Sequence, residues 1–547
     1  MRTVLGVHDG HDAGAALIHS NGIHAVNEER LSREKYHRGF PEKSIKEVIR
    51  LSDLEPKEID KVATAGIYRK KKRLLKLKRG LEEILGDADV ITVNHHKAHA
   101  AGAYFTSGWK KSIVLTIDAA GDGVSSALYI GEDGELKKIA ESSYLDSLGD
   151  FYASITEMLG FVPMRHEGKV MSLGAYYKGD NYHDFSKCIE VDGLSFENHL
   201  EVTGSESVKK LSEKVSFPLN RKEECSNVLR AGKKDHELWD KATRIAASAQ
   251  KHLENLLGQL CENIKKDDMI KEEFKEKICY SGGVAQNVKA NKIVRKKLQN
   301  SYIYPHMGDG GLALGAALYV NSKLTGKRNF WDWKENLKNV LLGPDFNSEK
   351  IEDVISKKDD LKWEKIEDKP DRISNMIEEG KLIGIFQGRM EYGPRALGNR
   401  SIIADPSKPN LKKELNQKLG REPFQPFSPT ILEEYKDEYL EVLDSNKFMT
   451  MSFDTTEKAA EDLAAAVHID GTCRPQILEP EDKRTLYEII KRFEEKTGIG
   501  AVLNTSFNLH GDPIVCTPKE AIDSMKKIGL DALLCEDYMA RKKIKDE

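Results

Sequence analysis

Long hydrophobic runs are absent from this chain of 547 residues. The longest apolar stretch without a charge runs from Leu312 to Val320, about half of the roughly 18 residues that suggest a membrane-spanning helix. Near the amino end, Gly, His and Asp interrupt the apolar residues of TVLGV too early for the hydrophobic core of a secretory signal. We therefore expect a soluble, cytoplasmic protein without a membrane partner.

Paired cysteines and a strong net charge are also missing. The seven cysteines are scattered, odd in number and free of any C-x-x-C pair, which favours structural thiols in a reducing compartment. With 85 basic against 89 acidic residues the net charge is −4, so no overall field attracts nucleic acid or anionic lipid. The one dense basic run, RKKKRLLKLKR at 69–79, lacks the aromatic residues of single-strand binders and is predicted to be a solvated helix face.

The length and composition predict a globular protein of at least two domains. Hydrophobic residues make up 39% of the chain, which with 42 glycines is enough to build extensive cores. A charged stretch dotted with aromatics, from about residue 323 to 371, breaks the pattern and is predicted to contain the main boundary. We place the domains at 1–345 and 346–547.

Repeated strand-loop-strand patterns predict an α/β fold with an internal duplication. TVLGV at 3–7 is followed by a Gly/Asp/His turn, a second apolar strand and an NGI hairpin turn, and the same order returns at 111–131. Apolar residues at near-3.6 spacing over 236–264 predict a long helix. The strand around 278–280 then delivers the turn SGGVAQN to a helix that ends near Lys297.

Two histidines and two aspartates form a candidate metal site. His95 and His99 are spaced i, i+4 and share one helix face, and the second position of the motif is His96 rather than the glutamate of a zinc protease. Asp118 ends the strand IVLTID, and Asp309 lies in GDGG. Such a donor set suits Fe(II), Mn(II) or Zn(II) with positions open for substrate. The alternatives are ordinary surface or core histidines and turn-capping aspartates.

Glycine turns and an arginine-rich loop are candidates for phosphate binding. Glycines let backbone N–H groups approach phosphates, and a helix start adds a favourable dipole, although a plain turn is the alternative. The loop at 388–401 carries three arginines, whose guanidinium groups match phosphate geometry, with surface ion pairs as the alternative. The candidate binding residues from these segments are Gly121, Asp122, Gly123, Gly282, Gly283, Asn287, Arg395, Arg400, Arg474 and Ser506.

Taken together, these segments resemble the NodU/CmcH-type O-carbamoyltransferases over nearly the whole chain. The matching pieces are GVHDGHDAGAALI, NEERLSREK, NHHKAHA, TIDAAGDG, HEGKVMSLG, YSGGVAQNVKAN, GDGGLALGAAL, EYGPRALGNRSIIADP, HIDGTCRPQ and NTSFNLHGDPIV. The resemblance implies an N-terminal, duplicated actin/Hsp70-type ATPase fold related to the threonylcarbamoyl-tRNA transferases. It implies a YrdC-like α/β domain at the C-terminus.

The resemblance also implies a two-site reaction. The C-terminal domain would make carbamoyl-adenylate from carbamoyl phosphate and ATP, and the N-terminal domain would transfer the carbamoyl group to a hydroxyl of a small metabolite. His95, His99, Asp118 and Asp309 would hold the metal, typically iron, while His11 would be the general base. Glu167 and Lys169 of HEGKVM would line the same cleft as cofactor-binding residues. Mg²⁺ is a further expected cofactor, a homodimer an expected assembly, and no nucleic-acid partner is expected.

One motif departs from the family pattern K-x-R-E-x-F-R-P. Leu419 stands at the lysine position and Gln425 at the second arginine, and Lys418 would substitute for the lysine by a one-residue shift. Either other residues hold the carbamoyl donor, or the donor differs. The alternatives to a carbamoyltransferase are a tRNA threonylcarbamoylation enzyme, a nucleotide-binding regulatory protein without turnover, and an ATPase or kinase of the actin/Hsp70 type.

Overall fold

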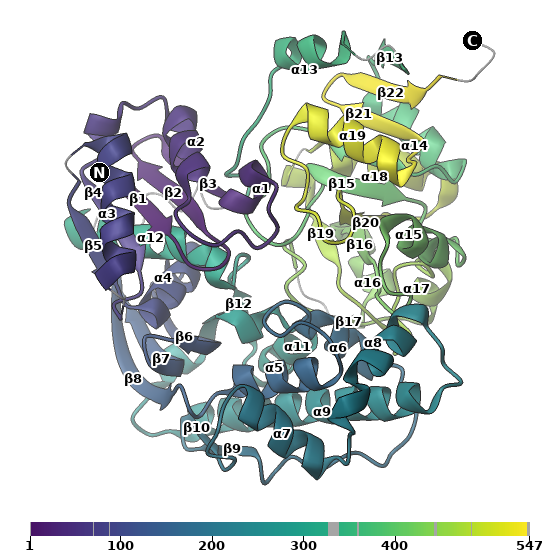
Figure 1. Ribbon diagram of the computed structural model, residues 1–547. Helices are drawn as coiled ribbons and strands as arrows, with labels where there is room; N and C mark the ends of the chain where they lie inside the picture. Colours follow the sequence, from purple (N-terminus) through teal and green to yellow (C-terminus); the bar gives the residue numbers. More distant parts are fainter. Residues whose placement is uncertain are drawn as a thin grey trace. The chain divides into compact units, whose positions relative to one another are not determined.

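The protein divides into two compact units in the computed structural model shown in Figure 1. The structure describes residues 2–68, 71–86, 88–325, 339–357, 360–441, 446–482 and 484–543. The first unit contains residues 1–32 and 36–340, and the second contains 33–35 and 341–547. The main change of unit therefore lies five residues before the expected boundary at 345, while 326–338 and 358–359 of the charged stretch lie outside the described residues.

Two five-stranded sheets of the same topology build the first unit. In each, three antiparallel strands are followed by two strands that run parallel to the first, in the orders β3-β2-β1-β4-β5 and β8-β7-β6-β11-β12. This repeat confirms the duplicated α/β fold. The first sheet consists of β1 (Val4–His8), β2 (Gly14–His19), β3 (Gly22–Asn27), β4 (Lys61–Ala65) and β5 (Val90–Val93). The second consists of β6 (Lys111–Gly121), β7 (Val124–Glu132), β8 (Glu135–Ser143), β11 (Lys277–Ser281) and β12 (Asn300–Ile303).

Helix α12 (Leu312–Thr325) packs closely against β1 and α4 (His95–Ser107). Glycines permit this approach, because a Cβ atom at Gly6 would lie 1.9 Å from the Ala313 carbonyl oxygen and one at Gly315 would lie 2.1 Å from that of Ala98. The longest apolar run of the sequence is thus a buried helix. Its packing places the start of α12 beside the start of α4, where candidate metal ligands lie.

The long helix and the basic helix are both confirmed. Helix α9 (Glu237–Lys266) buries the predicted apolar stripe, and α11 (Val288–Lys297) ends where the sequence predicts. In α3 (Lys71–Leu85) only Leu77 and Leu81 are buried, so its basic residues form a solvated face, with 69–70 outside the described residues. The other elements of this unit are α1 (Glu28–Ser32), α2 (Glu42–Ser52), η1 (Pro56–Glu58), α5 (Leu148–Met158), α6 (Glu167–Gly174), β9 (Ile189–Asp192), β10 (Ser195–Asn198), α7 (Ser205–Lys214), η2 (Leu219–Arg221), α8 (Lys222–Ala231), α10 (Glu272–Lys275), η3 (Gly283–Gln286) and η4 (Asp309–Gly311).

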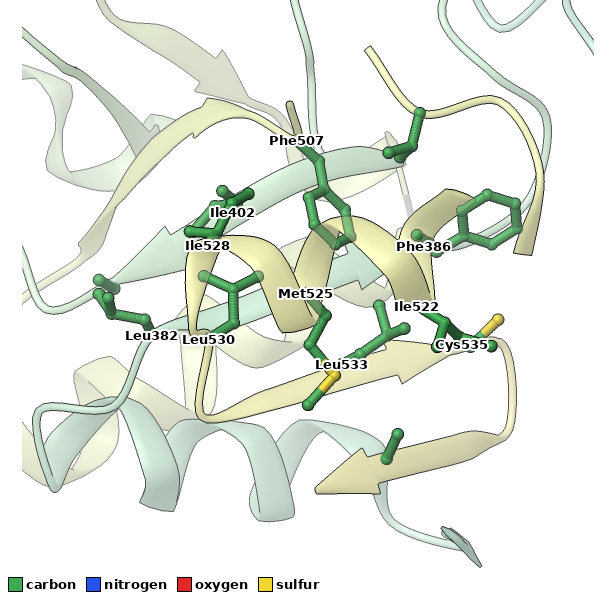
Figure 2. Packing of buried hydrophobic residues seen from close by; sticks show 14 of the residues in the cluster. Leu382, Phe386, Ile402, Phe507, Ile522, Met525, Ile528, Leu530, Leu533 and Cys535 are labelled. Atoms are coloured by element: carbon green, nitrogen blue, oxygen red, sulfur yellow. The ribbon is translucent and has the colours of Figure 1, made fainter. Parts of the chain in front are cut away.

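The second unit is an α/β fold built on one eight-stranded mixed sheet. Its strand order is β13-β22-β21-β14-β15-β20-β16-β19, and a separate hydrophobic cluster covers each face. Figure 2 shows Ile522, Met525 and Ile528 of α19 (Pro518–Ile528) packed with Leu382, Phe386 and Leu533 in one of these clusters. The strands are β13 (Leu361–Lys365), β14 (Ile383–Phe386), β15 (Arg400–Ala404), β16 (Ser428–Leu432), β19 (Gln476–Leu478), β20 (Ala501–Ser506), β21 (Ala532–Cys535) and β22 (Tyr538–Lys542).

Helices α14 and α18 supply the cluster on the other face. The helices and small elements of this unit are α13 (Ser348–Ile355), α14 (Lys369–Glu378), α15 (Leu411–Leu419), η6 (Glu433–Tyr435), α16 (Lys436–Tyr439), β17 (Phe453–Asp454), α17 (Glu457–Asp462), β18 (Thr472–Cys473), η7 (Pro480–Asp482), α18 (Thr485–Thr497) and α19 (Pro518–Ile528). All seven cysteines of the chain are buried and none is in a disulfide, which confirms structural thiols. Among the described residues, no helix combines the length and apolar character required to cross a membrane.

Candidate active site

Four side chains from three separate segments converge in the first unit. His95 and His99 project from the start of α4, Asp118 lies on β6, and Asp309 begins η4, the short helix before α12. Both histidines place Nε2 at 3.1 Å from Asp118 Oδ2, and His99 Nε2 lies 3.3 Å from Asp309 Oδ1. One ligand atom from each residue lies within 4.8 Å of the other three. Two imidazole nitrogens and two carboxylate oxygens at these separations fit a divalent transition metal.

Residues that the sequence analysis proposed for phosphate binding contact the start of α4. Asp122 accepts hydrogen bonds from the backbone N–H groups of Ile67, Tyr68 and His95, the last at 2.7 Å. A Cβ atom at Gly121 would lie 2.1 Å from the His95 ring, so only glycine leaves room for this imidazole. Asp122 and Gly123, with φ of 53° and 81°, form the hairpin turn. These three residues therefore position His95, a role that sequence reasoning missed.

The glycine turn of SGGVAQN supports Asp118 and His99. The Gly282 N–H donates to the Met307 carbonyl at 2.8 Å, and a Cβ atom at Gly283 would lie 2.7 Å from Asp118 Oδ1. Asn287 caps α11, because its side chain accepts a hydrogen bond from the Ala290 N–H at 3.0 Å. Gly282 precedes and Gly283 begins the short helix η3, which lies before α11. The hydrogen bonds of Gly282 and Asn287 within the fold therefore favour the turn alternative over a phosphate loop.

Opposite charges stabilise one another strongly in this cluster. Burial lowers the pKa of His99, but its hydrogen bonds to Asp118 and Asp309 outweigh burial and raise the pKa to about 9. For Asp118, burial raises the pKa, while the hydrogen bonds from His95 and His99 bring it well below the usual range. The pKa of Asp309 is lowered to about 2, since the charge of His95 helps to overcome burial. The carboxylates thus favour bound positive charge, which a metal supplies when it replaces the imidazole protons.

His11 lies at the edge of this cluster. Its Nε2 is 3.2 Å from Asp309 Oδ2, its Nδ1 is 3.2 Å from Asp12 Oδ2, and its side chain is 44% exposed. The hydrogen bond to Asp12 is the main cause that raises the pKa of His11 to about 9. The sequence argument assumed an unperturbed histidine with a pKa near neutrality, and the structure corrects that assumption. A general base must be neutral to accept a proton, so the hydrogen bond to Asp12 that raises the pKa of His11 opposes its role as a base.

Three further groups lie near the histidines, of which only Ser281 belongs to a segment that the sequence analysis singled out for phosphate binding. His8 lies 3.9 Å from Asp309 Oδ2, and burial lowers its pKa to about 3. Arg73 of α3 binds Asp9 with two hydrogen bonds, at 2.8 and 3.2 Å, and so holds the loop that leads to His11. Ser281 Oγ lies 3.4 Å from His99 Nδ1. In the sequence, His8 is marked only as the first histidine of HDGHD and Ser281 only as the serine of SGG. Neither pattern distinguishes a site residue from a residue that forms a turn.

Glu167 and Lys169 lie at the start of α6. Burial raises the pKa of Glu167, whose carboxylate accepts the Met164 N–H at 2.6 Å. Lys169 is buried, with Nζ 5.7 Å from the centre of the Phe161 ring. After burial and Glu29, the charges of Asp12 and Glu167 contribute to raising the pKa of Tyr36 to about 12. Glu167 and Asp12, the hydrogen-bond partner of His11, therefore both lie near Tyr36.

In the second unit, Arg400 has a structural role. It is fully buried, and its guanidinium lies 3.7 Å above the Phe386 ring. Its terminal nitrogens donate to the carbonyls of Gln387 at 2.7 Å, Asn399 at 2.9 Å, and Pro344 and Gly388 at 3.2 Å. These contacts occupy the group that the sequence assigned to a nucleotide. Arg400 therefore holds the loop together, and its assignment as a binding residue stays a prediction.

Arg395, Arg421 and Arg474 form a cluster of like charge. Burial lowers the pKa of Arg395 and Arg421 to about 10, and burial with the charges of the other two brings that of Arg474 well below its usual range. Within the described part of the chain, no ion pair joins these guanidinium groups to a carboxylate, and Arg395 Nε has no hydrogen-bond partner. A phosphate or carboxylate anion would relieve this repulsion. Arg421 was missed as a site residue, although the R-E pair of the family motif marks it.

The structure shows what surrounds Leu419 and Gln425, the two residues that depart from the family motif. Leu419 is buried in the hydrophobic cluster under α19, whereas Lys418 donates to the Gly529 carbonyl at 3.3 Å. Adjacent residues of a helix point about 100° apart, so Lys418 does not take the position of residue 419. Gln425 accepts a hydrogen bond from Arg421 Nε at 2.9 Å. Ser506 ends β20 directly after Thr505, whose hydroxyl accepts from Arg421 at 3.4 Å.

Comparison with known proteins identifies the family. Residues 66–318 match the family model described as carbamoyltransferase N-terminus, and 374–542 match carbamoyltransferase C-terminus. The chain is 38% identical to an uncharacterised protein of Methanocaldococcus jannaschii, MJ1051, over 98% of this chain and 99% of that one. It is 31% identical to nodulation protein NolNO of Sinorhizobium fredii, over 97% of this chain and 79% of the relative. HypF of T. kodakarensis aligns at 15% identity over 61% of this chain and 49% of that chain, with a TM-score of 0.35 that is too low to support an argument. The two family models and the similarity to NolNO show that this chain belongs to the carbamoyltransferase family and is an enzyme of that class.

Proposed function

We propose that the protein is an ATP-dependent O-carbamoyltransferase that modifies a hydroxyl group of a small metabolite. The observation that carries this proposal is the convergence of His95, His99, Asp118 and Asp309 on one point, with His11 at its edge. In the reaction, water cleaves carbamoyl phosphate to carbamate and phosphate. A carbamate oxygen then bonds to the α-phosphorus of ATP, which gives carbamoyl-adenylate and releases pyrophosphate. The acceptor oxygen then bonds to the carbamoyl carbon, AMP leaves, and the hydroxyl proton is removed.

The second unit would carry out the activation step. Arg395, Arg421 and Arg474 present guanidinium groups that compensate the charge of phosphate oxygens on ATP and carbamoyl phosphate. The absence of a carboxylate partner for these groups, among the described residues, supports this role. Since Leu419 and Gln425 replace two cations of the family motif, the three arginines would carry the electrostatic attraction for the carbamoyl donor.

The first unit would carry out the transfer. His95, His99, Asp118 and Asp309 would hold Fe²⁺ or a similar divalent ion, which supplies a Lewis acid for the carbamoyl oxygen. His11 would take the proton of the acceptor hydroxyl. Its exposure and its 3.2 Å distance from Asp309 support this assignment. The hydrogen bond to Asp12 contributes most to the raised pKa of His11, and the charges of Asp309 and Asp118 contribute less, so a cation bound by these two carboxylates would remove part of the shift.

The decisive experiment measures pyrophosphate release by purified, iron-loaded protein with ATP, with and without carbamoyl phosphate, together with a screen of hydroxylated metabolites. We expect release to require carbamoyl phosphate, and His99→Ala to abolish transfer of radiolabelled carbamoyl groups. His199→Ala, an exposed histidine that pairs with Glu190, is the matched control. Binding of ATP without any turnover would instead indicate a regulatory protein.

We place this reaction in the cytoplasm. It consumes ATP, and seven buried, unpaired cysteines fit a reducing compartment. The chemical identity of the acceptor would come from the metabolite screen, because loops rather than the cluster determine its pocket.

A further inference from the structure

The loop that carries Arg395 is held from inside by one buried carboxylate. Glu391 Oε1 accepts hydrogen bonds from the backbone N–H groups of Leu397 at 2.7 Å, Asn399 at 2.8 Å and Arg400 at 3.3 Å. Glu391 is itself buried. A carboxylate that accepts several N–H bonds in a buried setting strongly favours one loop conformation.

Two side chains hold the same loop from outside. The Leu397 carbonyl accepts from Gln476 Nε2 at 3.0 Å and from Arg484 Nη2 at 2.6 Å, and Arg484 also donates to Asn399 Oδ1 at 2.7 Å. Gly398 allows the close approach, because its φ is +109° and a Cβ atom there would lie 2.6 Å from Leu486. Leu397, two residues beyond Arg395, is therefore held on both sides. Its N–H donates to Glu391, and its carbonyl accepts from Gln476 and Arg484.

Gln476 connects this loop to the strands behind it. Its Oε1 accepts from Thr430 Oγ1 at 3.0 Å and from Asn504 Nδ2 at 3.2 Å, and Asn504 also donates to Thr430 at 2.9 Å. All three side chains are nearly inaccessible to solvent. The amide oxygen of Gln476 therefore accepts hydrogen bonds from side chains of the sheet, and its amide nitrogen donates one to the loop.

The same network reaches the other two arginines. Arg474, two residues before Gln476, donates to Ser428 Oγ at 2.9 and 3.1 Å, and Ser428 lies opposite Asn504 in the pairing of β16 with β20. Thr505, the next residue on β20, accepts from Arg421. Three guanidinium groups that repel one another are thus attached to one polar scaffold.

We propose that Gln476 and Arg484 are positioning residues that hold the Arg395 loop in its anion-binding conformation. The ligand assigned to this site rests on the proposed function. The physical reason is preorganisation: like charges move apart unless the backbone is fixed, and an anion binds more weakly when it must first reorder the loop. Neither residue needs to touch the ligand for this effect.

Two variants test the proposal with carbamoyl phosphate as the probe in titration calorimetry. Gln476→Met keeps the size and removes the amide, and Arg484→Met removes both donors to the loop. We expect about tenfold weaker binding for each, because the loop loses hydrogen bonds that hold it before the anion binds. Arg484→Lys, which keeps one donor, should restore part of the affinity. Arg492→Met is the control, because Arg492 lies on α18, the helix that begins directly after Arg484, and pairs with Glu495 at the surface.

A double-mutant cycle distinguishes positioning from general destabilisation. If Gln476 acts through Arg395, adding Gln476→Met to Arg395→Met should weaken binding no further, with thermal unfolding measured for all variants. Additive losses, or unchanged binding in a folded Gln476→Met, would overturn the inference while leaving the proposed function intact. If Gln476→Met does not fold, the comparison of Arg484→Met with Arg484→Lys decides, and equal affinities overturn the inference. Wild-type protein that binds neither carbamoyl phosphate nor ATP would overturn the proposed function itself.

Discussion

Replacing Gly121 with alanine tests whether the geometry around His95 creates the metal site. A Cβ atom at residue 121 would lie 2.1 Å from His95 Cδ2 and 2.6 Å from Nε2. Non-bonded carbon atoms keep about 3.5 Å apart, so the ring must retreat by roughly 1.4 Å. The His95 backbone cannot follow freely, because Asp122 holds its N–H at 2.7 Å. Metal–ligand distances tolerate only about 0.2 Å, so the imidazole no longer serves as a ligand.

The expected result is a selective loss of metal. Displacing a ligand should cost at least the roughly 10- to 100-fold in affinity that removal of an outer partner costs, and overpacking should destabilise the first unit by about 1–3 kcal/mol. Metal content after dialysis against a chelator, measured by mass spectrometry, gives the affinity loss. Gly258→Ala on α9 is the control, because its Cβ atom meets Ile293 at an ordinary 3.5 Å. If Gly121→Ala retained full metal content and carbamoyl transfer, the assignment of His95 as a constrained ligand would be refuted.

Three further changes have separate readouts. Asp122→Ala removes the acceptor for the His95 N–H, so we expect a lower melting temperature and reduced metal content, and an unchanged metal content would contradict its positioning role. Arg400→Met removes the hydrogen bonds to four backbone carbonyls, of which those of Asn399 and Pro344 keep a backbone N–H donor, so we expect destabilisation by about 3 kcal/mol in urea unfolding but unchanged ATP affinity in the folded fraction. Burial lowers the pKa of His306 to about 3, so only the unfolded chain binds its proton between about pH 6.5 and 3, and stability falls as the pH drops through this window. His306→Gln should reduce the loss of melting temperature between pH 7.5 and 5, and an equal loss in both proteins would exclude His306 as its source.

The sequence predicted elements well where the signal is local. The apolar stripe of α9, the strand-turn-strand repeats and the i, i+4 histidines each reflect a periodicity of 3.6 or 2 residues, which the chain expresses without reference to distant segments. The duplicated topology followed from the repeat. The resemblance to carbamoyltransferases depended on short motifs, which the family comparison confirms.

What the sequence could not decide is which polar residues of a motif serve a ligand and which serve the fold. Asp118 and Asp122 are four residues apart, yet the first faces the two histidines while the second binds backbone N–H groups. Arg395 and Arg400 share one loop, yet backbone carbonyls surround only Arg400. These outcomes depend on segments far away in the chain. Local spacing determines the direction of a side chain from its own helix or strand, but only tertiary packing determines which partners, and how much water, it meets there.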